Sequence, residues 1–247
     1  MNLSVVIPCY NYEKLITSNL KRLISKLKKI NHKFEIIIIN DGSTDKTLNK
    51  LKLIKNKYKY IKILSNKKNI GKSFSLIKGI SKSKYSNIVI YDCDLPYYNY
   101  LEKIINSLDK NSIVYINRKS KESRLTSKSM NYYQFMRYFL GRIASLLVNI
   151  LCLDLSIGDT QAGLKVFKKP KKFNEIKFIS KKFFFDAELL IIFHKLKKNI
   201  RYIPVNYSIA KSSTIKILDL KNFVYLFELI KISIFYKFIK IKDYEKL

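Results

Sequence analysis

Short apolar segments alternate with amphipathic segments along the first half of this chain, and this alternation constrains its fold more than any other feature. The expected strands cover Leu3–Ile7, Phe34–Ile39, Tyr60–Leu64, Asn87–Tyr91 and Ile113–Ile116. Segments with helical periodicity lie between and after them, at about residues 13–30, 44–56, 71–82 and 100–109. Regular alternation of strand and helix predicts an α/β fold with a mostly parallel central sheet. Functional residues are then expected at the carboxyl ends of the strands.

The second half of the chain departs from this rhythm. It contains a basic loop, a long helical run, a strand and a second helical segment, at Arg118–Ser129, Tyr132–Cys152, Ala162–Phe167 and Phe184–Lys198. No internal repeat and no linker rich in glycine, serine or proline divides the sequence. We therefore expect one continuous domain over residues 1–210, followed by an amphipathic helical appendage over residues 211–247.

The charge of the chain is strongly positive. It has 49 basic and 18 acidic residues among 247, which gives a formal net charge of +31. A hydrophobic content of 47% rules out a disordered chain. The lysines are spread over every segment instead of forming one basic patch, and this distribution argues against nucleic-acid binding. A generally positive surface favours contact with an anionic membrane surface.

Cysteine and histidine are scarce in this sequence. The three cysteines and two histidines, Cys9, Cys93, Cys152, His32 and His194, have no spacing typical of a zinc site or a disulfide framework. A reducing, cytoplasmic compartment is therefore expected. The first residues enter an apolar strand directly, without the basic and apolar regions of a cleavable leader.

The C-terminal segment Phe223–Ile241 has an amphipathic pattern. No stretch of the chain offers the roughly 20 uncharged residues that a spanning helix needs. One helical face of this segment combines Phe223, Leu226, Phe227, Ile230, Ile234 and Phe238. Its lysines lie largely on the opposite face. The pattern is typical of a helix at a membrane surface, and equally of a core helix with a solvated back.

Three polar motifs directly follow expected strands. They are Pro8-Cys9-Tyr10-Asn11, Asn40-Asp41-Gly42-Ser43-Thr44-Asp45 and Asp92-Cys93-Asp94. Gly42 allows the backbone to approach a ligand, and the polar residues after it can cap the next helix. Two carboxylates one residue apart can hold a divalent cation that also binds a diphosphate. A solvated turn is the alternative for such a triplet in isolation, but its position after a strand favours the metal.

Together with Asn69-Ile70-Gly71-Lys72, these motifs resemble the signature of the family-two glycosyltransferases with the GT-A fold. The resemblance covers about the first 120 residues. Later motifs, Gly158–Lys165 and Phe185-Asp186-Ala187-Glu188, are similar to those of the polyprenyl-phosphate (dolichyl-phosphate-like) sugar transferases. The form Asp-Thr-Gln-x-Gly-x-Lys is more similar to the glucosyl-transferring branch than to the mannosyl one. The resemblance implies a Rossmann-like GT-A catalytic domain that moves a sugar, with inversion, from a nucleotide-diphospho-sugar to a polyprenyl phosphate.

The same resemblance implies a donor site. Its nucleotide-sugar-binding residues are Pro8, Tyr10, Asn11, Glu13, Asp41, Lys72, Asp92 and Lys211. Asp41 is expected to recognise the base, and Lys211 to close over the donor. Asp92 and Asp94 are expected to bind Mg²⁺ or Mn²⁺, with UDP-glucose favoured as donor and GDP-mannose possible. Two departures affect the metal site, because Tyr12 displaces the usual acidic residue to Glu13 and Pro96 replaces a frequent glutamine ligand.

The acceptor side is also implied by the resemblance. Arg118 and Arg137 match positions that hold the phosphate of a lipid-linked acceptor at the cytoplasmic face of the membrane. Since a phosphate monoester has its second pKa at about 6, such an acceptor needs no strong base. The catalytic set is then Asp94, Asp159, Arg118 and Arg137. Asp159 either orients the sugar or acts as a base, or it caps a turn; Glu188 is either a binding residue or a buried hydrogen-bonding one.

Two other functions stay open at this point. One is a family-two transferase that adds a sugar to a hydroxyl of a surface polysaccharide or lipopolysaccharide, in which Asp159 has to serve as the base. The other is an inactive protein that binds polyanions through its charge. Retention of both Asp92 and Asp94 favours an active enzyme.

Overall fold

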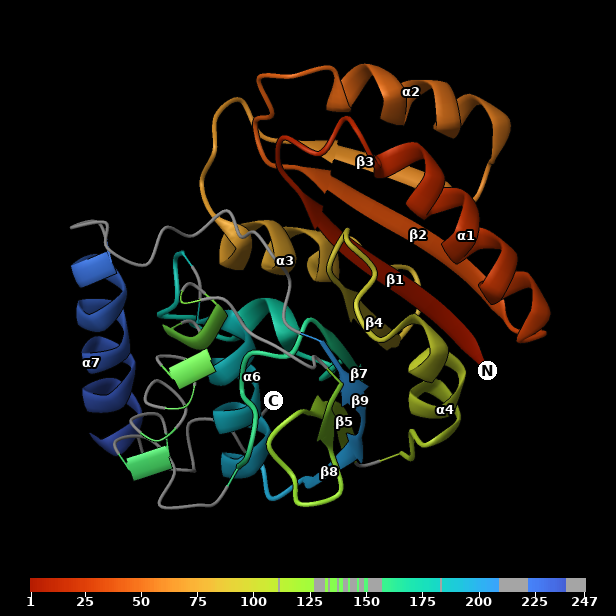
Figure 1. Cartoon of the computed structure of the whole chain (residues 1–247). Coiled ribbons are helices and arrows are strands. Elements are labelled where there is room, and N and C mark those ends of the chain that lie inside the picture. The colour runs from red at the N-terminus through yellow and green to blue at the C-terminus, as the bar shows by residue number, and fades with distance from the viewer. Residues whose placement is uncertain are drawn as a thin grey trace.

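A seven-stranded sheet forms the centre of the protein, for which we use a computed structural model (Figure 1). The structure describes residues 1–110, 112–126, 132, 134–136, 138–139, 142, 146, 149–150, 157–182, 184–208 and 222–238. The strand order is β3-β2-β1-β4-β7-β5-β8. The strands are β1 (Asn2–Cys9), β2 (Lys33–Asn40), β3 (Ile61–Ser65), β4 (Asn87–Tyr91), β5 (Ser112–Asn117), β7 (Leu164–Lys168) and β8 (Asn199–Pro204). A separate two-stranded sheet pairs β6 (Arg124–Leu125) with β9 (Asn206–Tyr207).

The sheet is mostly parallel, as the sequence predicts. Strand β1 pairs in parallel with both β2 and β4, and β5 pairs in parallel with β8. Strand β7 alone runs antiparallel to its neighbours in this sheet, β4 and β5. Consequently β1, β2, β4 and β5 all end at the same edge of the sheet, which we call the carboxyl edge.

Helices cover both faces of the sheet and make a three-layer α/β fold. The helices are α1 (Ile16–Lys29), α2 (Thr47–Lys57), α3 (Lys72–Ser81), α4 (Leu101–Asn106), α6 (Phe185–Lys195) and α7 (Asn222–Phe238), with short 3₁₀ turns at Tyr98–Tyr100 and Phe173–Glu175. One core cluster joins α1, α2 and α4 to one face, and a second joins α3 and α6 to the other. Both faces of strands such as β2 are therefore buried, which explains the unbroken isoleucine run of that strand.

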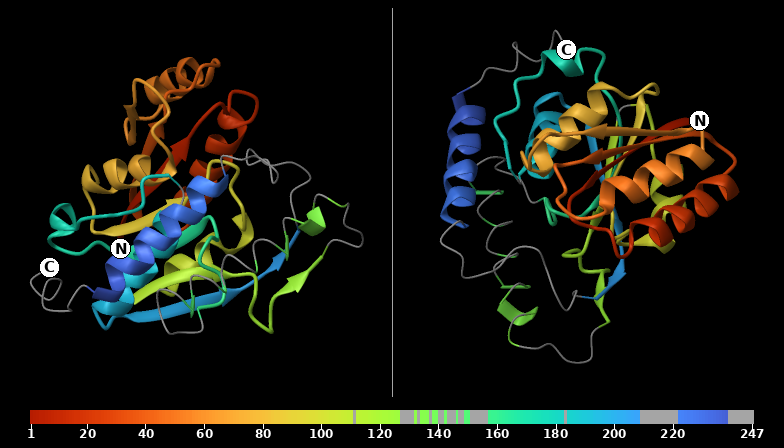
Figure 2. Two further views of the ribbon diagram at one scale, coloured as in Figure 1. Left: turned by 90° about the vertical axis from the view of Figure 1, so that its left-hand side faces the viewer. Right: turned by 90° about the horizontal axis from the view of Figure 1, so that it is seen from above.

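Helix α7 forms an outer layer next to α6 (Figures 1 and 2). Its inward face buries Leu229, Ile232 and Tyr236, together with Glu228. Its outward face exposes Phe227, Ile230 and Ile234. The sequence leaves a choice between a surface helix and a core helix, and α7 has features of both. Within the described residues, no helix is both long enough and apolar enough to cross a bilayer.

Candidate active site

The loop after β1 is fastened to the loop after β2 at the carboxyl edge. Asn11 has a left-handed backbone (φ 47°), and its side-chain oxygen accepts a hydrogen bond from the Thr44 amide at 2.8 Å. The Glu13 carboxylate accepts one from the Lys46 amide at 2.8 Å, and the Glu13 amide donates to Asp45 at 3.1 Å. A cavity of about 290 Å³ lies here, lined by residues 11–15 and Asp45. The two loops thus form one wall of an open recess at the carboxyl edge.

Two further expected donor residues lie on β1 and directly after it. Pro8 is the penultimate residue of β1 and is paired in register with Ile39 of β2. Tyr10 directly follows that strand and is 41% exposed. A tyrosine exposed at the carboxyl edge is available for contact with a ligand, and Pro8 is partly buried two residues before it.

Asp41, at the end of β2, is almost completely buried. Its carboxylate accepts hydrogen bonds from the Asn66 side chain at 2.8 Å and from the backbone amides of Ile70 at 3.0 Å and Gly71 at 2.9 Å. Gly71 has a φ of 105°, which side chains rarely allow. Asp41 therefore fixes the loop that leads into α3 and places Lys72 at the first position of that helix.

Lys72 lies between two carboxylates. Its ammonium group is 2.8 Å from Asp92 Oδ1 and 3.0 Å from Asp186 Oδ2. Asp186 also pairs with the fully buried Lys165, whose Nζ lies 2.8 Å from Asp186 Oδ1. Burial by itself lowers the pKa of Lys72, but the Asp186 and Asp92 carboxylates outweigh burial and raise that pKa above its ordinary value. Lys72 is therefore a permanent positive charge beside Asp92.

Asp92 and Asp94 follow β4 and differ in their surroundings. Asp92 is half-buried against Gly163, where a β-carbon would stand only 2.7 Å from the Asp92 carboxyl carbon. Asp94 is exposed. Among the described residues, no group of three or more acidic, histidine or cysteine side chains could hold a metal ion. Mg²⁺ commonly takes only one or two carboxylates and completes its shell with water and substrate phosphates, and the two aspartates fit that manner of binding.

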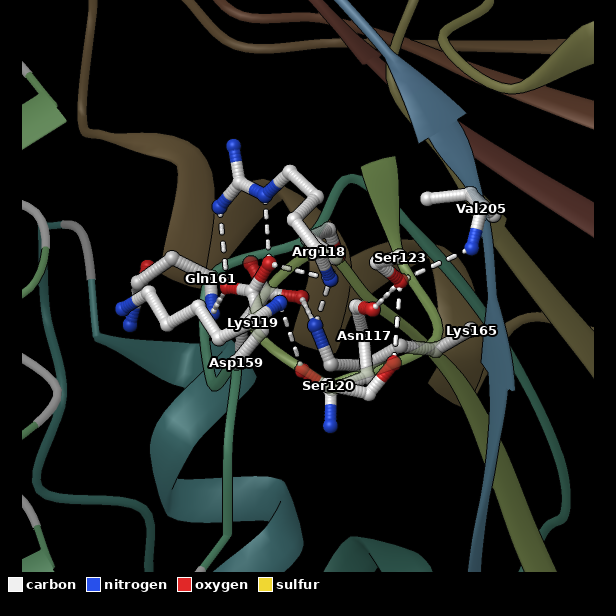
Figure 3. A network of polar contacts seen from close by, with 11 residues as sticks. Asn117, Arg118, Lys119, Ser120, Ser123, Asp159, Gln161, Lys165 and Val205 are labelled. Carbon is white, nitrogen blue, oxygen red and sulfur yellow. Dashed lines mark hydrogen bonds and ion pairs between the residues drawn. The ribbon is translucent and has the colours of Figure 1, made fainter. Parts of the chain in front are cut away.

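Arg118 and Asp159 form a close ion pair just after the end of β5. Both the Nε and the Nη2 of Arg118 donate to the Asp159 carboxylate, the latter at 2.8 Å. The same carboxylate accepts from the backbone amides of Arg118 at 3.3 Å and Gln161 at 3.2 Å. Figure 3 shows the two side chains facing each other, with the remaining guanidinium nitrogen of Arg118 pointing away from Asp159. Asp159 thus caps the turn before β7 and orients Arg118.

This environment decides the protonation state of Asp159. Burial alone raises the pKa of its carboxyl, but the guanidinium of Arg118 outweighs burial and holds that pKa below its ordinary value. The carboxylate is fully buried, whereas the side chain of Arg118 is 30% exposed. Asp159 in this arrangement is an ionised and weakly basic group, and Arg118 presents unused N–H donors to the site.

The structure describes one of the three remaining sequence-predicted residues. Arg137 and Lys211 lie outside the described residues. Glu188 is buried in α6 and accepts hydrogen bonds from the backbone of Ile179 and Ser180. It therefore lies behind the site as a structural hydrogen-bond acceptor.

Sequence reasoning missed two features of the site. One is the network of Lys72, Asp186 and Lys165, although Asp186 lies within a motif quoted for the resemblance. The other is the amide of Gln161, whose oxygen and nitrogen are both buried without a hydrogen-bond partner in the described part of the chain. A buried amide without partners is costly, and one that lies next to the Arg118–Asp159 pair is suited to bind a polar ligand. The only sequence signal for it was its place in the motif Gly158–Lys165.

Two solved structures that were crystallised with nucleotide sugars have similar folds. Glucosyl-3-phosphoglycerate synthase from Mycobacterium tuberculosis, crystallised with Mn²⁺, UDP-glucose and phosphoglyceric acid, aligns with a TM-score of 0.63 and 16% identity over 94% of this chain and 79% of that one. TarS from S. aureus in complex with UDP-GlcNAc aligns with a TM-score of 0.59 and 17% identity over 99% and 69%. At these identities the likeness shows the fold alone, and it confirms the expected GT-A architecture.

Relatives by sequence are similar over most of the chain. A dolichyl-phosphate beta-glucosyltransferase from Trichomonas vaginalis is 28% identical over 247 residues, which cover 95% of this chain and 73% of that protein. The human dolichyl-phosphate beta-glucosyltransferase is 29% identical over 223 residues, which cover 85% and 68%. Residues 4–156 match the family model of glycosyl transferase family 2. Since this match spans more than half of the chain and contains the motifs of the carboxyl edge, the protein belongs to glycosyl transferase family 2.

Proposed function

We propose that this glycosyltransferase moves glucose from UDP-glucose to the phosphate of a polyprenyl phosphate, with inversion at the anomeric carbon. The observation that carries the proposal is the ion pair of Arg118 and Asp159, because it removes Asp159 as a base and leaves Arg118 with free donors. The sequence relatives named as dolichyl-phosphate beta-glucosyltransferases support the same acceptor class. A hydroxyl acceptor is not favoured, because a hydroxyl has to lose its proton to a base and Asp159 is only weakly basic in its pair with Arg118.

Charged residues after β4 and at the start of α3 indicate how the diphosphate of the donor is bound. Asp94 is the exposed candidate ligand for Mg²⁺ or Mn²⁺, and Asp92 is its half-buried neighbour beside Lys72. A bound divalent cation neutralises the negative charge that develops on the departing diphosphate. Lys72 adds a permanent positive charge 2.8 Å from Asp92, where it can bind a diphosphate oxygen. The similar fold crystallised with Mn²⁺ and UDP-glucose supports a divalent cation and a UDP-sugar donor.

The acceptor side needs orientation more than proton transfer. An ionised phosphate oxygen attacks the anomeric carbon, the bond from that carbon to the diphosphate oxygen breaks, and the electron pair leaves with UDP. Arg118 holds the incoming phosphate through the N–H groups that Asp159 does not use. Both histidines lie away from this region, since His32 precedes β2 and His194 is at the end of α6. Catalysis then depends on positioning and charge.

Sugar transfer to polyprenyl phosphate tests the proposal directly. Radiolabelled UDP-glucose, and in parallel GDP-mannose, is incubated with undecaprenyl or dolichyl phosphate in the presence of Mn²⁺ or EDTA. We expect a metal-dependent lipid product from UDP-glucose, with kcat/KM for the acceptor falling only below about pH 6, where its phosphate becomes protonated. UDP-glucose hydrolysis without a lipid product instead supports a saccharide acceptor and overturns the proposed one.

Two exposed apolar stripes support attachment to an anionic membrane surface. One consists of Phe227, Ile230 and Ile234 on α7. The other consists of five exposed apolar residues among the described positions between 132 and 150, namely Tyr132, Phe135, Phe139, Leu146 and Ile150. Helix α7 lies at the left of Figure 1. Exposed apolar side chains can insert into the hydrocarbon region of a bilayer, and the net charge of +31 favours bilayers with anionic headgroups.

Vesicle flotation measures this attachment. We expect the protein to float with phosphatidylcholine vesicles that contain phosphatidylglycerol and to float less in high salt. The triple variant Phe227→Asn, Ile230→Asn, Ile234→Asn should bind at least tenfold more weakly, since each buried apolar side chain contributes about 1.5 kcal/mol or more. Leu53→Asn is the matched control, because Leu53 is a 65% exposed leucine on α2. Equal flotation of the triple variant and the wild type contradicts a role for α7.

A further inference from the structure

A short segment between the 3₁₀ turn at Phe173–Glu175 and α6, residues 179–182, forms one side of the start of α3. The Ser73 amide donates to the Lys182 carbonyl at 3.3 Å, and the hydroxyls of Ser73 and Ser180 are 2.7 Å apart. A β-carbon on Gly71 would stand 2.8 Å from the Lys181 carbonyl oxygen. The backbone of this segment therefore packs directly against the residues on either side of Lys72.

Two carboxylates hold this segment from the opposite side. Glu188 of α6 accepts from the amides of Ile179 at 2.6 Å and Ser180 at 2.8 Å. Glu228 of α7 accepts from the amides of Lys181 at 2.6 Å and Lys182 at 2.9 Å, and from the Ser180 hydroxyl at 2.8 Å. Four successive backbone N–H groups thus end on two glutamates. Hydrogen bonds to charged groups are the stronger ones, and buried N–H groups left without acceptors are costly.

The tyrosine of α7 completes this arrangement. The Tyr236 hydroxyl donates to Glu188 Oε1 at 2.7 Å, and Tyr236 is fully buried. Helix α7 therefore contacts the segment twice, once directly through Glu228 and once through Glu188. Burial raises the pKa of Glu188, while the hydrogen bonds from Ile179, Tyr236 and Ser180 oppose that rise.

The segment connects α7 to the charges of the donor site. From Glu228 the contacts run through Ser180 to Ser73, and Lys72 precedes Ser73 in the first turn of α3. The Lys72 ammonium then contacts Asp92 and Asp186. A displacement of residues 179–182 moves the backbone that carries Lys72, and displacements of about 1 Å are sufficient to impair a site.

The geometry points to Glu228 as a positioning residue for donor binding: helix α7, through Glu228, holds the first turn of α3 so that Lys72 meets the diphosphate of the donor. This inference rests on the proposed function, in which Lys72 binds the donor. Helix α7 then has two roles: its inward face supports the donor site, and its outward face carries the exposed apolar stripe. Donor affinity is therefore set partly by a helix that carries no donor-binding residue.

The test measures donor binding in solution, apart from any membrane effect. For Glu228→Ala we expect the Kd for UDP with Mn²⁺, by isothermal titration calorimetry, to rise about tenfold, and the KM for UDP-glucose to rise equally. The kcat and the KM for polyprenyl phosphate should stay within about twofold of wild type. Glu228→Gln keeps one acceptor oxygen and should show a smaller rise. Glu175→Gln is the matched control, since Glu175 is a glutamate with a 63% exposed side chain.

The possible results separate the explanations. A merely structural role lowers the melting temperature and the active fraction of Glu228→Ala and leaves the Kd of the folded protein unchanged, which overturns the inference. If Glu228→Ala does not fold, Ser180→Ala removes the hydroxyl between Ser73 and Glu228 while keeping the backbone bonds. We then expect a rise of about threefold in Kd for Ser180→Ala, and an unchanged Kd overturns the inference. A wild-type protein that binds no UDP overturns the proposed donor as well.

Discussion

Replacing Asp94 by alanine is expected to reduce sugar transfer about a thousandfold. Asp94 is the exposed carboxylate after β4, and Asp92 beside it is already paired with Lys72 at 2.8 Å. Charge neutralisation by a divalent cation contributes several kcal/mol to the transition state, and each 1.4 kcal/mol or so changes the rate about tenfold. The measurement is the initial rate of lipid-linked product formation at saturating UDP-glucose and Mn²⁺.

Binding data separate loss of the metal from general damage. With Asp94→Ala, Mn²⁺ should no longer strengthen UDP binding, whereas binding of UDP with EDTA present should match the wild type. Asp109→Ala is the matched control, because Asp109 forms an exposed ion pair with Arg201 at 3.3 Å, and exposed pairs contribute little to stability. If Asp94→Ala keeps its Mn²⁺-dependent rate, Asp94 is not a ligand and the proposed donor site is wrong.

The strands that end at the carboxyl edge could be predicted from the sequence. In β2 the run from Ile36 to Ile39 is completely buried, and such continuous β-branched runs arise when helices cover both faces of a strand. The polar motifs after these strands then had to meet at one edge. Strand β8 could not be predicted in this way. It is an edge strand with Arg201 and Tyr202 exposed and Pro204 at its end, so it has neither a continuous nor an alternating apolar pattern.

The contacts behind the site could not be predicted, because they depend on residues far apart in the chain. Lys72 pairs with Asp186, which lies more than a hundred positions later, and no local pattern relates the two. Glu228 is a similar case. No local pattern around it indicates burial, yet it is only 8% exposed because residues 180–182 supply its hydrogen-bond donors.

Replacing Arg118 by alanine is expected to lower the free energy of unfolding by about 3–5 kcal/mol at neutral pH, because the buried Asp159 carboxylate loses its partner. Urea unfolding measures this loss. Arg201→Ala is the matched control, since it removes an exposed pair with Asp109 and an exposed hydrogen bond to the Ser107 carbonyl and should cost about 1 kcal/mol or less. A loss for Arg118→Ala no larger than for Arg201→Ala contradicts the assigned ion pair.

The pH dependence of this loss follows from the pKa of Asp159. In the wild type that pKa lies below its unfolded value, so the stabilisation is present above about pH 4 and is lost as pH falls through the folded-state pKa. In Arg118→Ala burial is opposed only by Lys119, Lys165 and the two backbone amides, so the folded-state pKa of Asp159 rises above its wild-type value, and lowering the pH protonates the carboxyl and relieves the penalty. The stability difference between wild type and Arg118→Ala should therefore shrink from pH 7.5 to pH 5. A pH-independent difference contradicts this account.

The kinetics of Arg118→Ala test whether Arg118 binds the phosphate of the acceptor. If Arg118 binds the phosphate of the polyprenyl phosphate, Arg118→Ala should raise the acceptor KM about tenfold to a hundredfold, since hydrogen bonds to charged groups contribute about 1.5–3 kcal/mol. The Kd for UDP should stay within about twofold, because the proposed donor contacts come from β1, from the loops after β1, β2 and β4, and from Lys72 of α3. Arg118→Lys keeps the charge but loses the planar fork that matches both Asp159 and a phosphate. An intermediate acceptor KM for Arg118→Lys therefore indicates that charge and geometry both act, and an acceptor KM unchanged in both variants removes Arg118 from acceptor binding.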